Sequence, residues 1–250
     1  MEQALFLSRP AELTGAYTRL HYGAEFCPWN LSPAHDILAM RRACRDAGWR
    51  FSLVTPVVDE AAYTHLLRLL EKVLPELDAD DEVVVNDLGS IESVRALRDD
   101  LTLVVGRALS GQKRGPQILD LELNDAQRDY FRQGTWYSSA NRELLAGLGI
   151  ARIELDNLFQ GLAALPAGLS GTLHTPYAMV TSSGTCPFRE HAEKGSCPAP
   201  CGEVMVLTTP ESQVPLYQGG NTQFAKLESL PENLDTLGID RVVYHPFLPR

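Results

Sequence analysis

The sequence predicts a TIM-like (β/α)8 barrel, an α/β fold in which eight parallel strands alternate with helices. The chain of 250 residues has the length typical of such a barrel. Short β-rich runs alternate along it with longer segments of helical periodicity. Several β-rich runs, such as 83–85 and 103–105, are apolar throughout, as expected for strands buried on both faces of a parallel sheet. We expect a single domain over residues 1–250.

Eight segments have the composition of barrel strands. In chain order they are Ala4–Ser8, Leu20–Ala24, Phe51–Val57, Glu82–Asn86, Leu101–Gly106, Ala151–Leu155, Gly171–Tyr177 and Arg241–Tyr244. Residues favoured at helix N-caps precede the helical segments. The predicted starts are Ser32 with Pro33, Asp59 before Glu60–Leu74, Ser90 before Ile91–Arg98, and Ser138 or Ser139 before Asn141–Leu148.

The alternation of strands and helices breaks after Tyr177. A cysteine-bearing segment, Thr181–Gly202, is followed by two β-rich runs, Val204–Thr208 and Val214–Gln218, with a turn between them. We interpret residues 181–224 as a cysteine-bearing β-rich insertion, a loop and a hairpin, between the seventh and eighth strands. Such an insertion lies at the C-terminal mouth of the barrel, where enzymes of this fold carry their chemistry.

Four of the five cysteines form a pattern typical of a metal centre. Cys186, Cys197 and Cys201 are spaced Cys-x10-Cys-x3-Cys among glycines and prolines, and Cys27 directly follows the second strand. All four are expected at the same mouth of the barrel, as ligands of an iron–sulfur cluster or of a structural zinc ion. Cys44 instead shares the apolar face of a helical segment and is expected in the core.

Composition restricts the classes of function. A formal net charge of −10 and a pI near 5.1 argue against independent nucleic-acid binding, which needs a basic surface. No apolar run is long enough to span a membrane, and residues 1–10 lack the pattern of a signal peptide. We therefore expect a cytoplasmic protein, in which clustered thiols are metal ligands before they are disulfides.

Polar residues at predicted strand ends are candidates for catalysis or substrate binding. His174 and Glu154 are candidates for proton transfer. The alternatives are a satisfied rim histidine for His174 and a salt bridge to Arg152 or Arg107 for Glu154. Asp87 is a third catalytic candidate, although an N-cap of the following helix explains it as well. Arg107 is the candidate for binding an anionic substrate, because guanidinium groups bind carboxylates bidentately.

Short motifs in chain order resemble the peptidase U32 family, the collagenase-like proteases. The matching segments are Tyr22–Cys27, Asn86–Gly89, Gly106–Leu109, Ile153–Leu155, His174–Tyr177, Ser183–Cys186 and Ile239–Tyr244. One early and three late cysteines make the chain most similar to the short, V-type iron–sulfur members of oxygen-independent ubiquinone biosynthesis. Arg107 departs from the family pattern, which often has a histidine there, and the usual C-terminal extension is not found.

The resemblance implies a 4Fe-4S cluster on Cys27, Cys186, Cys197 and Cys201. It also implies a role in oxygen-independent hydroxylation of a small aromatic or prenylated substrate, together with a larger U32-family partner subunit. A non-catalytic, cluster-bearing scaffold subunit and an RNA-hydroxylating protein are alternatives. Peptidase activity has less support, because no HExxH or Gly-x-Ser-x-Gly motif is present and the cysteines are assigned as ligands.

Overall fold

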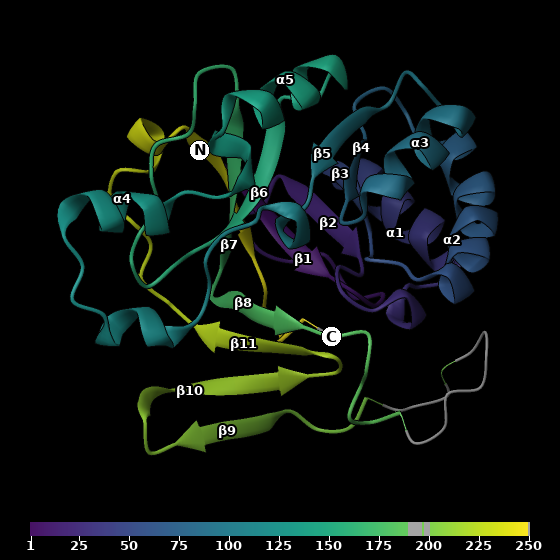
Figure 1. Ribbon diagram of the computed structural model, residues 1–250. Coiled ribbons are helices and arrows are strands. Elements are labelled where there is room, and N and C mark those ends of the chain that lie inside the picture. The colour runs from purple at the N-terminus through teal and green to yellow at the C-terminus, as the bar shows by residue number, and fades with distance from the viewer. Residues whose placement is uncertain (190–196, 198–200, 250) are drawn as a thin grey trace.

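The computed structural model describes residues 1–189, 197 and 201–249, and its centre is a closed parallel barrel (Figure 1). The strands of the barrel are β1 (Glu2–Leu7), β2 (Arg19–Gly23), β3 (Arg50–Thr55), β4 (Glu82–Val85), β5 (Thr102–Val105), β6 (Arg152–Asp156), β7 (Ser170–Thr175) and β12 (Ile239–Tyr244). They pair in this order, and β12 closes the barrel against β1. The predicted TIM-like fold and all eight predicted strands are confirmed.

The outer layer is less regular than that of an ideal barrel. In the described part of the chain the α-helices are α1 (Ala34–Asp46), α2 (Glu60–Val73), α3 (Leu88–Leu97), α4 (Asp125–Arg132) and α5 (Ser139–Gly147). Figure 1 shows α1, α2 and α3 together on one side of the barrel, α4 on the opposite side and α5 at the top of the view. The segments 8–18 and 157–169, which join β1 to β2 and β6 to β7, contain no helix.

Two of the predicted helix starts are wrong. The N-cap of α1 is Pro33 rather than Ser32, because the Ser32 hydroxyl donates to the Ser8 carbonyl oxygen at 3.0 Å. Helix α3 begins before Ser90, since the Asp87 carboxylate accepts the Gly89 N–H and caps the helix there. The predicted caps Asp59 and Ser138 are confirmed.

Burial follows the two faces of the barrel strands. Outward-facing apolar side chains such as Leu53 and Val83 join the helices in one large core, which also contains Cys44 with no exposed surface. The predicted core position of Cys44 is thus confirmed. Inward-facing residues form a small apolar cluster that includes Phe6 and Val84, and above and below it the barrel interior is charged.

The inserted segment forms a separate antiparallel sheet. Its strands are β8 (Tyr177–Ser182), β9 (Met205–Thr209), β10 (Ser212–Gly219) and β11 (Thr222–Lys226), paired in the order β8–β11–β10–β9. The expected runs at 204–208 and 214–218 correspond to β9 and β10. The expected limits of 181–224 are too narrow. β7 ends at Thr175, and β8 begins after Pro176, which has no backbone N–H to donate to a neighbouring strand.

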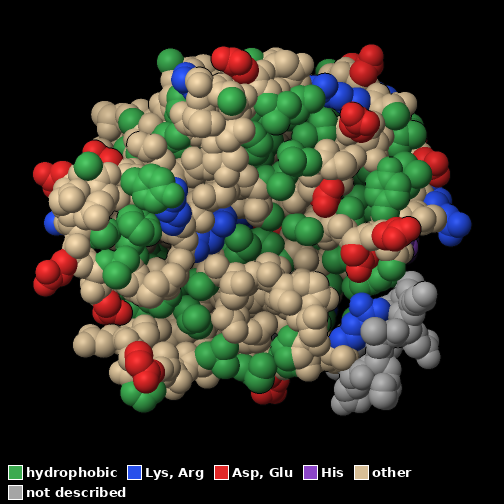
Figure 2. Space-filling view, in the orientation of Figure 1, with side chains coloured by type: hydrophobic (Ala, Val, Ile, Leu, Met, Phe, Trp, Pro, Cys, Tyr) green, Lys and Arg blue, Asp and Glu red, His purple; other side chains and the backbone are tan. Residues whose placement is uncertain are grey.

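The surface is acidic without a continuous basic area on the face shown. In Figure 2, Asp and Glu side chains lie around the periphery, and Lys and Arg side chains do not merge into one patch. The edge strand β9 exposes Met205, Val206 and Leu207. Among the described residues, no helix combines the length and apolar character needed to cross a bilayer.

Candidate functional site

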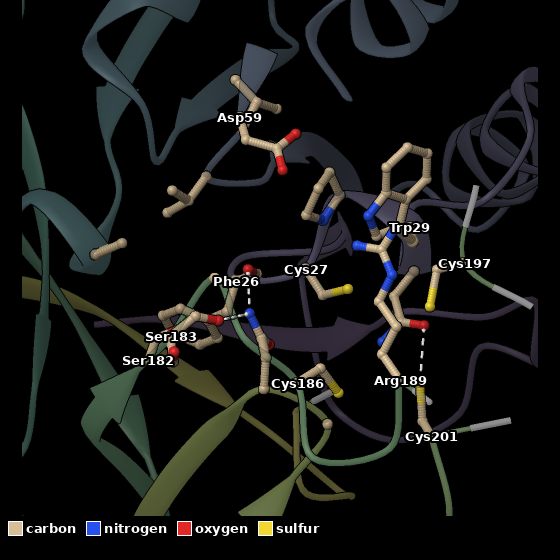
Figure 3. A pocket seen from close by; sticks show the side chains of 18 of the residues that line it. Phe26, Cys27, Trp29, Asp59, Ser182, Ser183, Cys186, Arg189, Cys197 and Cys201 are labelled. Carbon is tan, nitrogen blue, oxygen red and sulfur yellow. Dashed lines mark hydrogen bonds between the residues drawn. The ribbon is translucent and has the colours of Figure 1, made fainter. Parts of the chain in front are cut away.

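The four predicted ligand cysteines line one cavity of about 370 Å³ at the mouth of the barrel. Cys27 follows β2, whereas Cys186, Cys197 and Cys201 belong to the segment between β8 and β9. Figure 3 shows their sulfur atoms facing a common space. We call this cavity the thiol pocket.

Local backbone geometry places Cys27 at the pocket. Gly23, at the end of β2, has φ 147°, and a Cβ there would lie 2.0 Å from the Val54 carbonyl oxygen, so only glycine permits this approach to β3. A 3-10 turn, Pro28–Asn30, starts directly after Cys27. Burial raises the pKa of the Cys27 thiol, while the backbone N–H groups of Trp29 and Asn30 donate to its sulfur and lower it. Such N–H groups stabilise a thiolate ligand.

The late cysteines are tied to the same turn. The Cys201 thiol lies 3.5 Å from Asn30 Oδ1, so the inserted segment contacts the turn that follows Cys27. Cys201 also has φ 60°, in the left-handed region that residues other than glycine rarely adopt. Strained backbone of this kind concentrates at functional sites. Two independent features therefore mark Cys201 as a residue held in a specific position.

The spacing of the sulfurs differs from that of a single-ion site. Four thiolates that bind one zinc ion at about 2.3 Å lie about 3.8 Å from one another. Among the described residues, the set of three ligand atoms that lie within 4.8 Å of one another is Glu25, His174 and His245. The thiols do not form such a set, so their present spacing is wider than a single zinc ion requires.

Charge in the thiol pocket is sparse. Of its described lining residues, Arg189 is the one lysine or arginine and Asp59 the one carboxylate. The Arg189 side chain extends among the sulfur atoms (Figure 3), and its guanidinium carbon lies 5.8 Å from the centre of the Trp29 ring. A guanidinium here counters the negative charge that thiolate ligands bring.

Beneath the pocket, the upper half of the barrel holds a buried network around Glu154. Its carboxylate contacts His21 Nε2 at 2.8 Å and His174 Nε2 at 3.0 Å, and His174 Nδ1 lies 2.7 Å from His245 Nε2. Burial alone would raise the pKa of Glu154, but His174 and His21 lower it well below its usual value. Burial lowers the pKa of His21 and of His245.

Arg107 joins this network to the pocket wall. Its guanidinium, with no exposed surface, donates to both oxygens of Glu25 at 2.7 and 2.6 Å and to Asp156 Oδ1 at 2.8 Å. Arg114 binds the other Asp156 oxygen at 2.8 Å. The ring of Phe26, which lines the thiol pocket, lies 5.4 Å from the Arg107 guanidinium carbon. The pocket and the charged network therefore share a wall.

These contacts change the interpretation of three candidates. His174 and Glu154 lie in the interior with no exposed surface and bind each other, rather than facing the mouth. Arg107 already binds two carboxylates, so a substrate carboxylate would have to displace one of them. Asp87 caps α3, as its alternative interpretation required.

Comparison of the chain with protein-family models, curated proteins and solved structures finds no match.

Glu25, His21 and His245 are among the buried residues of the network that were not candidates from the sequence. Glu25 lies two residues before Cys27, and only that position pointed to it. His21 lies two residues after Arg19 on β2, so both side chains point to the same face, the barrel interior. His245, directly after β12, has 1% exposure and stacks on Phe6 at 4.5 Å. Their meeting depends on closure of the barrel, which brings β2, β6, β7 and β12 around one interior.

Proposed function

We propose that this protein binds a 4Fe-4S cluster through Cys27, Cys186, Cys197 and Cys201. We further propose that it takes part in oxygen-independent hydroxylation in ubiquinone biosynthesis, acting on a small aromatic or prenylated substrate with a larger U32-family partner. The observation that carries the proposal is the convergence of one early and three late cysteines on one pocket while Cys44 is buried elsewhere.

The donor set fits a cluster better than zinc. Both groups accept four thiolates, but the sulfurs are spaced more widely than one zinc ion requires. The N–H donors at Cys27 and the guanidinium of Arg189 counter the charge of a cluster with four thiolate ligands. When bound, a cluster supplies electron transfer or an iron atom that binds a substrate oxygen.

The residues around the thiols have separate roles in this proposal. Trp29, Phe26 and Met179 give the pocket apolar walls that exclude water and contact an aromatic or prenylated group. Arg189 is the lysine or arginine among the described lining residues of the pocket. Arg107 acts from below by holding Glu25 and the wall formed by Phe26.

Comparison of Cys27→Ala with Cys44→Ala tests the proposal, because both variants remove a thiol and only one changes the pocket. After anaerobic purification and reconstitution, we expect roughly four iron and four sulfide per chain in the wild type and in Cys44→Ala. Cys27→Ala is expected to lose most of both. Each protein is then expressed anaerobically in a strain that lacks the gene, and its quinone pool is measured.

We expect the wild type and Cys44→Ala to restore anaerobic quinone synthesis and Cys27→Ala not to. Zinc without sulfide in the wild type would refute the cluster. An unchanged quinone pool in the deletion strain would refute the pathway while leaving the cluster intact.

A further inference from the structure

We propose a second metal site inside the barrel, in which Glu25, His174 and His245 bind one divalent transition-metal ion. Their ligand atoms lie within 4.8 Å of one another in the described structure. The site shares no ligand with the thiol pocket and does not depend on the proposed cluster.

The three ligands come from different parts of the barrel. Glu25 follows β2, His174 is on β7, and His245 follows β12. His174 Nδ1 lies 2.7 Å from His245 Nε2 and 4.0 Å from Glu25 Oε1. Two imidazoles and one carboxylate are the donor set of many mononuclear sites with open positions. A shared ion would require the 2.7 Å contact between the two nitrogens to widen.

The surroundings of His174 also match those of a metal ligand. Metal-bound histidines generally donate their other ring N–H to a carboxylate, which fixes the tautomer and ring orientation. His174 Nε2 lies 3.0 Å from Glu154 Oε2, and Glu154 has no exposed surface. A carboxylate acceptor at Nε2 favours the Nε2–H tautomer of His174, with Nδ1 directed at His245 and Glu25.

Charge balance also favours a cation at this position. In the described upper half of the barrel, three carboxylates, those of Glu25, Glu154 and Asp156, accompany two guanidinium groups. Arg107 and Arg114 bind Glu25 and Asp156, whereas the partners of Glu154 are the imidazoles of His21 and His174. One negative charge is therefore left without a permanent positive partner. A neutral imidazole is also the form that binds a metal.

Arg107 limits the strength of the site without blocking it. It donates to both oxygens of Glu25, but each carboxylate oxygen has two lone pairs, so Oε1 retains one for a metal. The guanidinium orients the carboxylate and repels the ion. We therefore expect weaker binding than at a four-ligand structural zinc site. Two nitrogen donors favour cobalt, iron or zinc over magnesium and calcium.

Cobalt binding to the full chain tests this site. To exclude the thiol pocket, Cys27→Ser, Cys186→Ser, Cys197→Ser and Cys201→Ser are combined in one protein. This protein is titrated anaerobically with Co²⁺, and visible absorption and bound metal after desalting are measured. We expect one Co²⁺ per chain and a thermal midpoint that rises with Co²⁺ concentration. Failure to bind cobalt in this folded protein would overturn the site.

Three substitutions in the same cysteine-free pocket variant test the assignment of the ligands. His245→Ala is expected to weaken Co²⁺ binding by at least about tenfold, and Glu154→Gln by about 10- to 100-fold as the residue that positions His174. His21→Ala is the matched control, because His21 contacts the same Glu154 but is not a ligand. Its affinity is expected to stay within a few-fold of the parent, and circular dichroism checks folding. Equal weakening by His21→Ala and His245→Ala would refute the assignment. Loss of the cluster is measured separately, as iron and sulfide in the wild type.

Discussion

The barrel interior contains two charged layers that differ in composition and position. The lower layer, at the N-terminal ends of the strands, pairs Arg19 and Arg241 with Glu2 and Glu82. Arg19 contacts Glu2 at 3.0 Å, and Arg241 contacts Glu82 at 2.8 Å. The two positive charges balance the two negative charges, so the ion pairs form a closed set.

The upper layer is larger and is not balanced by arginine alone. It combines three carboxylates, two arginines and three histidines, and it contacts the wall of the thiol pocket through Phe26. In barrels of this kind, the N-terminal face serves stability and the C-terminal face carries the chemistry. The difference between the layers indicates that the lower one stabilises the barrel, whereas the upper one also supports the site.

The largest expected decrease in the free energy of unfolding comes from removing one arginine in each layer. Arg107→Met leaves Glu25 buried without its guanidinium partner and removes one of the two arginines that bind Asp156. Arg241→Met removes one of the two arginines that bind Glu2 and Glu82. Each change is expected to lower the free energy of unfolding by about 3–5 kcal/mol. Only Arg107→Met should also lower the iron bound per folded chain, because it loosens the wall next to Cys27.

Urea unfolding of the metal-free proteins and iron analysis of the folded fractions measure these two effects. Arg152→Met is the control, since its ion pair with Asp240 lies at the surface and contributes about 0–1 kcal/mol. Equal loss of iron in Arg107→Met and Arg241→Met would remove the distinction between the layers.

An intermediate change in the free energy of unfolding is expected when the pH is lowered and the carboxylates of the lower layer are protonated. Arg241 and Arg19 outweigh burial and lower the pKa of Glu82 to about 2. Because the folded pKa is below the unfolded one, the ionised form contributes stability above about pH 4.5, which is lost as the pH falls toward 2. At about 1.4 kcal/mol per pKa unit, this contribution is on the order of 3 kcal/mol.

Glu82→Gln removes this titration and leaves the upper layer intact. The difference in free energy of unfolding between wild type and Glu82→Gln should be greatest at pH 7 and shrink steadily below pH 4.5. Urea unfolding at pH 7, 5, 4 and 3 measures it. A difference that stays constant over this range would show that the lower layer acts by packing rather than by charge.

The sequence could predict the strands and the convergence of the cysteines for physical reasons. A strand buried on both faces is apolar throughout, as at 83–85, so its composition alone marks it. Cys27 follows a strand and the other three lie in an insertion after another strand. The parallel order of the barrel brings both positions to the same mouth.

The buried network could not be predicted in the same way. His21 and Glu154 are 133 residues apart and lie on strands that do not pair, so only closure of the barrel joins them. Arg107 is predicted from the sequence as a binding residue for an anionic substrate for the same reason, because its two carboxylate partners are distant in sequence. Strand β8 was missed because it continues from β7 after a single proline and belongs to a different sheet.

The smallest expected change in stability is at Asp87, which lies on the upper side of the barrel but outside the buried network. Asp87→Ala removes the N-cap of α3 and should cost about 1 kcal/mol, with no change in iron content or hydroxylation. Ser138→Ala, which removes the N-cap of α5, is the matched control and should cost a similar amount. Thermal unfolding and anaerobic quinone synthesis are measured for both. Loss of quinone synthesis in Asp87→Ala alone, at equal stability, would extend the functional site to β4. Unchanged quinone synthesis in both variants would be consistent with a functional site limited to the sector formed by β2, β6, β7 and β12, where the carboxylates and histidines meet beneath the thiols.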